Sequence, residues 1–159
     1  MKRMLTIVVM ILISYTQVYA LTLSGVVTNV VDGDTIDIGK DRVRLKYIDA
    51  PENTLKHIQI YGKESSEYLT SLILNKNVTV TYSKNDLSYG RIVGTVMVGK
   101  TNANKMMVSE GYAWSYTGYS TKAFDKLQSA AKLAKIGMWK PELNVTCEPW
   151  NFRKKKCAN

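Results

Sequence analysis

Residues 24–48, SGVVTNVVDGDTIDIGKDRVRLKYI, are rich in β-branched side chains and are interrupted by two short turns. Gly39 and Lys40 form the second turn, where glycine permits the tight reversal of a hairpin. The stretch therefore predicts three consecutive strands, at residues 24–31, 35–38 and 42–48. Similar runs at residues 78–82 and 91–98 bring the expected strands to five, the number in a small Greek-key barrel.

Three other segments have helical patterns. Residues 63–74 repeat apolar side chains at helical spacing, residues 104–110 read as a short helix ended by Gly111, and residues 122–135 read as a longer amphipathic helix. The order of these elements predicts an α+β protein. We expect an OB-fold, five-stranded Greek-key barrel with about three helices, the first of which lies across the bottom of the barrel.

Asp34, Asp49 and Glu52 are the carboxylates of greatest chemical interest. Strand alternation puts Asp34 on the same face as Ile36 and Ile38, so we expect it at the end of an inward-facing row. A buried charge is tolerated when it is paired or bound to a metal, and Ca²⁺ accepts several oxygen ligands in flexible geometry. Taken alone, residues 32–34 would favour an ordinary Asp-Gly-Asp turn over a metal site.

Arg44 lies between these carboxylates, and a later Tyr-Gly-Arg run adds Arg91. A guanidinium can bind phosphoryl oxygens through two parallel hydrogen bonds, and a carboxylate near a metal-bound phosphate can accept a proton from water. We interpret Arg44 and Arg91 as a phosphate clamp that neutralises transition-state charge, and Glu52 as the residue that activates or orients the attacking water. The alternative for Glu52 is a surface carboxylate after a turn.

Five short motifs follow one another along the chain in the same order as in one known protein family. They are Asp-Gly-Asp-Thr from residue 32, Arg-Leu-x-x-x-Asp-x-Pro-Glu from residue 44, Tyr-Gly-x-Glu from residue 61, Tyr-Gly-Arg from residue 89 and Gly-x-Trp from residue 137. Through them the chain resembles the thermonuclease family of calcium-dependent nucleases, typified by staphylococcal nuclease. The resemblance implies hydrolysis of DNA and also of RNA, with little sequence preference.

The resemblance also implies roles for individual residues. Asp34, Asp49 and the carbonyl of Ala50 would bind Ca²⁺, with Ala50 held extended by the following proline. Many members of the family have threonine where this chain has Ala50. A carbonyl ligand survives that change, whereas a contact made by the threonine hydroxyl does not.

Three tyrosines are candidates to stack on a nucleobase or to bind a phosphate, by likeness to the family's tyrosine-lined nucleotide pocket. Tyr89 belongs to the Tyr-Gly-Arg motif, whereas Tyr116 and Tyr119 are equally expected to pack within the fold.

One geometric condition must hold for the whole site. Arg44 and Asp49 are five residues apart, so they face one site only if the chain bends or bulges before Asp49.

The first residues have the pattern of an export signal. Lys2 and Arg3 precede an apolar run at residues 4–13, and Ala20 ends a short polar segment, which predicts a secretory signal peptide over residues 1–20. The apolar run is about half of the roughly 20 residues that span a bilayer, so no stable membrane insertion is expected. Residues 21–142 would then form one thermonuclease-like domain, and residues 143–159 a basic tail.

The net charge of +9 at pH 7 favours polyanionic partners such as nucleic acid. Cys147 and Cys157, the two cysteines, both lie in the tail, and an oxidising compartment would allow them to form a disulfide. Such a bridge would pin the basic segment 150–156 to the body. The single histidine, His57, excludes a His-based zinc site and leaves a Ser or Cys triad without a suitable base.

These features favour an exported, monomeric, Ca²⁺-dependent nuclease, periplasmic or extracellular, with DNA and RNA as substrates. One alternative is a nucleic-acid-binding OB-fold module that has lost catalysis. Three carboxylates facing a polyanion argue against it, since they would repel the phosphates. A cationic structural protein of the cell envelope would explain the charge but not the acidic cluster.

Overall fold

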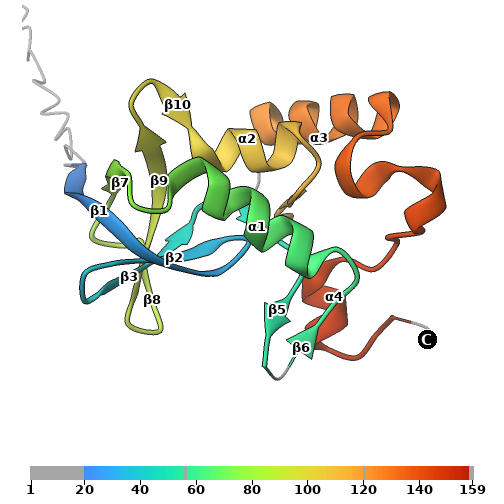
Figure 1. Ribbon diagram of the computed structural model, residues 1–159, viewed down its shortest axis with the longest axis horizontal. Coiled ribbons are helices and arrows are strands. Elements are labelled where there is room, and N and C mark those ends of the chain that lie inside the picture. The colour runs from blue at the N-terminus through green and yellow to red at the C-terminus, as the bar shows by residue number, and fades with distance from the viewer. Residues whose placement is uncertain (1–19, 56, 120, 158–159) are drawn as a thin grey trace, which may run out of the picture.

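The computed structural model describes residues 20–55, 57–119 and 121–157, so nearly all of the expected signal peptide lies outside the described residues. Five strands close into a barrel (Figure 1). They are β1 (Leu21–Asp32), β2 (Thr35–Ile38), β3 (Asp41–Leu45), β7 (Asn77–Tyr82) and β9 (Arg91–Val98). β1 pairs antiparallel with β2 and β7, β2 with β3, and β7 with β9. The parallel pair of β3 and β9 closes the ring, which confirms the predicted five-stranded barrel.

Three helices lie within about one residue of the predicted bounds: α1 (Gly62–Ile73), α2 (Ala103–Ser109) and α3 (Lys122–Ala134). The tail adds a fourth, unpredicted helix, α4 (Pro149–Arg153). Two 3₁₀ turns precede it, at Gly137–Trp139 and Pro141–Leu143. Over the described residues, the structure contains no helix both long enough and apolar enough to span a membrane.

Among the described residues, six short strands lie outside the five strands of the barrel. They are β4 (Ile48–Asp49), β5 (Asn53–Thr54), β6 (His57–Ile58), β8 (Leu87–Ser88), β10 (Thr101–Asn102) and β11 (Trp114–Ser115). The hairpin of β5 and β6 leads from the barrel into α1, and α4 lies beside this hairpin although it comes from the other end of the chain (Figure 1).

The main hydrophobic core fills the barrel and extends to two helices. Ile36, Val43 and Val80 point inward from the strands and are fully buried, and Leu69 of α1 and Met107 of α2 join them. Ile36 and Ile38 are both buried, as strand alternation predicted, and Asp34 is buried at the end of the same row. Removal of this apolar surface from water is the main driving force for closing the barrel.

The third predicted strand is not continuous, and the expectation of one strand over residues 42–48 is wrong. β3 ends at Leu45, and Tyr47 adopts a left-handed backbone conformation with φ 71°. The chain therefore turns, and Ile48 and Asp49 pair with β11 instead of extending β3. The backbone N–H of Tyr116 donates to the carbonyl of Tyr47 at 2.9 Å, which holds the turn. This is the bend that the site required between Arg44 and Asp49.

Asn104 supports the same bend from α2. Its side chain is fully buried; Oδ1 accepts from the N–H of Val96 at 2.8 Å, and Nδ2 donates to the carbonyls of Lys46 at 2.9 Å and Gly94 at 3.1 Å. Asn104→Ala is expected to lower the free energy of unfolding by about 3 kcal/mol, because it leaves two buried backbone groups and one partly buried one without these partners. Denaturant unfolding measures the loss. The exposed Asn85→Ala should change stability by less than about 0.5 kcal/mol, and equal losses in both variants would contradict the assignment.

Candidate active site

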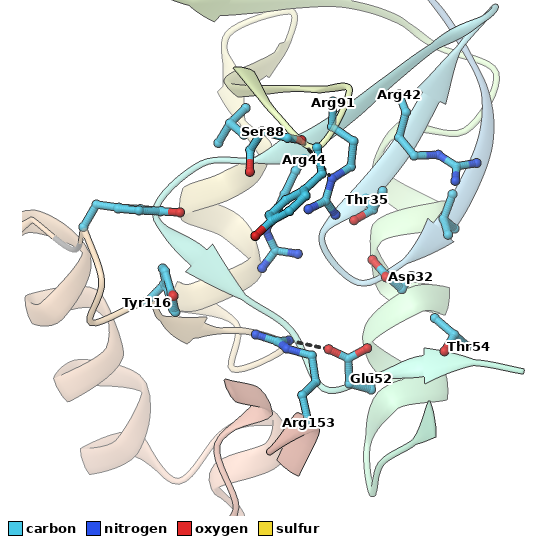
Figure 2. A pocket seen from close by; sticks show the side chains of 14 residues that line it. Asp32, Thr35, Arg42, Arg44, Glu52, Thr54, Ser88, Arg91, Tyr116 and Arg153 are labelled. Carbon is cyan, nitrogen blue, oxygen red and sulfur yellow. Dashed lines mark hydrogen bonds and ion pairs between the residues drawn. The ribbon is translucent and has the colours of Figure 1, made fainter. Parts of the chain in front are cut away.

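A cavity of about 490 Å³ opens beside the barrel, between β2, β3 and β9 on one side and the tail on the other. Six of the predicted site residues line it: Arg44, Glu52, Arg91, Tyr89, Tyr116 and Tyr119. In Figure 2, Arg44 and Arg91 extend into the cavity from one side, and Glu52 faces them from the other side. The structure thus brings together the guanidinium groups and the carboxylate that the sequence separates by up to 47 positions.

Arg44 lies at the base of this cavity and bridges two buried carboxylates. Its Nη1 donates to Oδ1 of Asp34 at 2.6 Å, and its Nη2 donates to Oδ1 of Asp49 at 2.7 Å. The Arg44 side chain is 20% exposed, against 3% for Asp34 and 0% for Asp49. The guanidinium is therefore fixed in orientation from behind, while part of it still faces the cavity.

Asp34 is held by its own neighbours as well as by Arg44. Its Oδ1 accepts from the hydroxyl of Thr35 at 2.9 Å, and its Oδ2 accepts from the N–H of Ala50 at 2.9 Å. Asp32 forms the turn that the alternative interpretation expected, since its Oδ1 accepts from the N–H of Asp34 at 3.0 Å. The turn and the site are therefore one structure, in which the turn points Asp34 at Arg44.

The acidic groups outnumber the basic groups that hold them. Burial raises the pKa of Asp34, against the opposing effect of Arg44. Burial likewise raises the pKa of Asp49 and of Asp32, which itself lines the cavity. A buried carboxylate resists ionisation unless a positive charge compensates it. The cluster of Asp32, Asp34 and Asp49 is thus suited electrostatically to additional positive charge, although the cavity itself is also lined by arginines.

One member of the site, Arg153, was not predicted from the sequence. This residue ends α4, and its Nη2 donates to Oδ2 of Asp49 at 2.7 Å while its Nη1 donates to Oδ1 of Asp49 at 3.0 Å and to Oε1 of Glu52. Figure 2 shows Arg153 and Glu52 meeting at the cavity. A signal was present in the sequence, because the cysteine pair brackets the segment that contains Arg153, but nothing there indicated which basic residue enters the site.

Arg91 and the tyrosines are held less firmly. Arg91 Nε donates to the carbonyl of Ser88 at a long 3.5 Å, and Tyr89 is 95% exposed. Tyr116 meets Tyr119 edge-on with ring centroids 5.0 Å apart, and contacts the ring of Trp150 at 5.6 Å. Tyr116 therefore packs against two aromatic rings and also lines the cavity, whereas Tyr119 lines the cavity and is 56% exposed.

The metal ligands implied by the sequence can be tested against this geometry. Among residues 20–55, 57–119 and 121–157, no three acidic, histidine or cysteine side chains are gathered as a ready metal cluster. Arginines already bind both aspartates. A carboxylate offers about four lone-pair positions. Three hydrogen bonds to Asp34 and three to Asp49 leave about one position on each, and these hard oxygens are of the kind that bind a divalent cation.

Comparisons with known proteins identify the family of the chain. Residues 42–141 match the model of the family described as staphylococcal nuclease homologue. The chain is 41% identical over 138 residues to an uncharacterized endonuclease of Escherichia coli, covering 83% of this chain and 86% of that protein. It is 34% identical over 146 residues to a micrococcal nuclease of Shigella flexneri, covering 82% and 80%.

The family match covers residues 42–141, which include four of the five short motifs, those from Arg44 to Trp139. The chain belongs to the staphylococcal nuclease homologue family. This membership supports nuclease activity on a nucleic acid substrate and confirms the resemblance found in the sequence.

Proposed function

We propose that this protein is an exported, Ca²⁺-dependent nuclease that hydrolyses phosphodiester bonds of DNA and RNA with little sequence preference. The observation that carries the proposal is the bridge from Arg44 to Asp34 and Asp49 at the base of a cavity that Glu52 also lines. A binding module would not require a buried acidic pair beneath its phosphate contacts. Catalysis requires one, because hard oxygen ligands hold a divalent cation.

Each side chain has a distinct task in this proposal. Asp34, Asp49 and the Ala50 carbonyl would hold Ca²⁺, which supplies charge that polarises the scissile phosphate. Arg44 and Arg91 bind the phosphoryl oxygens and offset the negative charge that grows on them. Glu52 accepts a proton from water as the water oxygen forms a bond to phosphorus, while the bond from phosphorus to the leaving oxygen breaks and that oxygen takes a proton from solvent.

Broad substrate use follows from the kinds of group that face the cavity. Arginines contact phosphates, which every nucleotide carries, and the exposed ring of Tyr89 offers a face on which any base can stack. Neither contact reads a base edge. The same groups accept DNA and RNA, and no contact in the proposal depends on a 2′-hydroxyl.

Export and a monomeric state are parts of the same proposal. Cys147 and Cys157 form a disulfide, a bond that persists mainly in oxidising compartments such as the periplasm or the cell exterior. The pattern of residues 1–20 supports export independently. One chain supplies all the residues assigned above, so the proposed chemistry has no need of a second subunit.

The decisive experiment is digestion of single-stranded DNA, double-stranded DNA and RNA by the mature protein, with Ca²⁺, with Mg²⁺ and with a chelator. Cleavage of all three polymers with Ca²⁺ and its loss in chelator are expected. Full activity in excess chelator would refute the metal requirement. Tight binding of the polymers without any cleavage under these conditions would favour the inactive binding module instead.

A further inference from the structure

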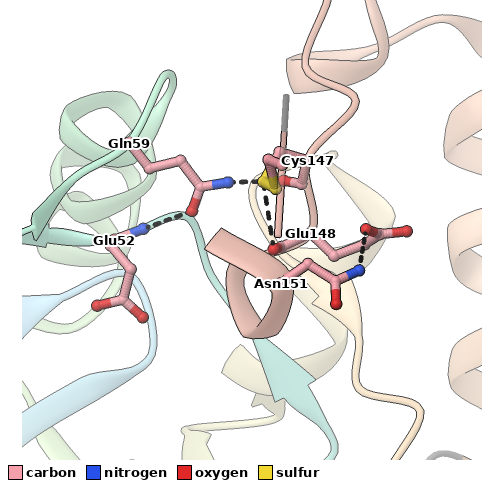
Figure 3. The surroundings of a disulfide bond; sticks show 6 residues. Glu52, Gln59, Cys147, Glu148 and Asn151 are labelled. Atoms are coloured by element: carbon pink, nitrogen blue, oxygen red, sulfur yellow. Dashed lines mark hydrogen bonds between the residues drawn. A yellow bond between two sulfur atoms is a disulfide. The ribbon is translucent and has the colours of Figure 1, made fainter. Parts of the chain in front are cut away.

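The tail reaches Glu52 by two separate routes, and both depend on a segment that the disulfide closes. Cys147 and Cys157 are ten residues apart and bracket α4. Arg153 at the end of α4 contacts the Glu52 side chain, and Cys147 at the start of the segment connects to the Glu52 main chain through Gln59 (Figure 3).

The main-chain route runs through a single buried amide. Gln59 is 5% exposed; its Oε1 accepts from the N–H of Glu52 at 3.2 Å, and its Nε2 donates to the carbonyl of Cys147 at 2.6 Å. The N–H of Gln59 also donates to the carbonyl of Glu52 at 2.8 Å. Both polar ends of the Gln59 side chain are therefore used, and together they connect the segment after β4 to the disulfide.

The side-chain route runs through Arg153. Two nitrogens of its guanidinium donate hydrogen bonds to Asp49, and one of them, Nη1, also donates to Oε1 of Glu52. The Asp49 side chain is fully buried, so Arg153 connects Glu52 to a point inside the fold. Only one Glu52 oxygen is used in this contact, and the other stays available to accept a proton.

Aromatic packing fixes the helix that carries Arg153. Trp150 lies one helical turn earlier, and residues three apart share a helix face. Its ring meets Trp114 edge-on at 6.2 Å between centroids and Tyr116 at 5.6 Å. The same face of α4 thus packs on the body of the protein and presents Arg153 to the site.

We propose that the disulfide-closed tail is a clamp that positions Glu52 for catalysis, with Gln59 holding its main chain and Arg153 its side chain. The proposal rests on the role of Glu52 proposed above. Arg153 is a positioning residue: it acts through Glu52 and Asp49. It follows that the nuclease reaches full activity only after the disulfide has formed.

Kinetics of Arg153 variants on a short single-stranded DNA test the side-chain route. Arg153→Gln should lower kcat by about 10- to 100-fold with KM within about threefold of the parent, since displacement of a catalytic group mainly affects the chemical step. Arg153→Lys should recover part of the loss. Lys126→Gln, which removes an exposed charge from α3, is the matched control and should behave as the parent.

A double-mutant cycle separates positioning from direct phosphate binding. If Arg153 acts through Glu52, then Arg153→Gln should cause little further loss in a Glu52→Gln background. Losses that multiply would show that Arg153 acts by a route other than Glu52, and a change confined to KM would show that it binds substrate; either result would overturn the clamp.

Amide hydrogen exchange tests the main-chain route without any assay of activity. In the Cys147→Ser, Cys157→Ser double variant, the Glu52 amide should exchange at least about tenfold faster, while the amides of Val80 and Val96 in the barrel keep their protection. Reduction of the folded parent with dithiothreitol should give the same pattern. Unchanged protection of Glu52 would overturn the clamp, and this result can be read even if the parent cleaves no nucleic acid, so failure of the clamp and failure of the proposed function are distinguishable.

Discussion

Arg44→Lys is expected to lower kcat by on the order of 10² or more, because a lysine cannot bridge two carboxylates and a phosphate at once. Arg44 uses one nitrogen on Asp34 and another on Asp49, and keeps further N–H donors for substrate. A single ammonium group at the end of a lysine could not contact all of these partners in the same geometry. The loss should appear in kcat, because the fork binds charge that is largest in the transition state.

The same substitution should also destabilise the protein, and this effect has to be separated from the catalytic one. Removing part of a buried ion-pair network leaves a carboxylate without its partner, which costs up to about 3–5 kcal/mol when a pair is broken completely. Thermal unfolding by circular dichroism gives the stability of each variant, and kinetics are measured well below the lower midpoint.

Arg91→Lys is the matched comparison. Arg91 has one long hydrogen bond to the Ser88 carbonyl at its Nε, so its replacement should change stability little. Its kcat should nevertheless fall to a similar degree if both arginines bind transition-state charge. An Arg44 variant that loses stability but keeps the parental kcat would show that Arg44 is a structural bridge alone, and a loss confined to KM would indicate ground-state binding.

Local sequence patterns were sufficient to predict most of the fold. β-branched runs and the turns at Gly39 and Gly99 located four of the barrel strands within a few residues, because alternation and turn chemistry act over short distances. The break in the third strand was not predictable in position. It depends on Tyr47, a residue with no intrinsic preference for positive φ, held there by pairing with a strand more than 60 residues later.

In the site too, residues close together in the sequence could be predicted, whereas a residue far away in the sequence could not. Asp34, Arg44, Asp49 and Glu52 lie close together in the chain, and the spacing of their motif was enough to group them from the sequence alone. Arg153 lies 101 positions after Glu52 and is one of several basic residues in the tail. Composition could not distinguish it from the lysines that follow, since the contacts that orient α4, including the packing of Trp150 on Trp114 and Tyr116, come from distant parts of the chain.

Asp34→Asn is expected to abolish Ca²⁺-dependent cleavage and also the stabilisation that Ca²⁺ gives to the folded protein. A ligand that binds the native state alone stabilises it by about 2.7 kcal/mol at 100 times its dissociation constant. The parent should therefore unfold at a higher temperature when Ca²⁺ is added. Asparagine replaces one oxygen of Asp34 with an amide nitrogen, removes the negative charge and so weakens the cation site.

The folded barrel should survive this change, because two effects on stability oppose each other. Burial raises the pKa of Asp34, so its charged form is less favourable than in water, and a neutral side chain relieves part of that desolvation cost. Against this, the amide nitrogen would face one of the donors that now bind Asp34, at a cost of about 1–3 kcal/mol. The apo variant should thus unfold within a few degrees of the apo parent.

Asp37→Asn is the control for the metal response. Asp37 lies three positions later, on the opposite face of the chain, where it pairs with Arg42 and Asn29 at the surface. Its variant loses one carboxylate from the same strand region, yet it should keep both the Ca²⁺-induced rise in unfolding temperature and the cleavage activity. A parental calcium shift in Asp34→Asn would place the cation elsewhere, whereas loss of the shift in both variants would mean that the protein responds to overall negative charge and not to a ligand at position 34.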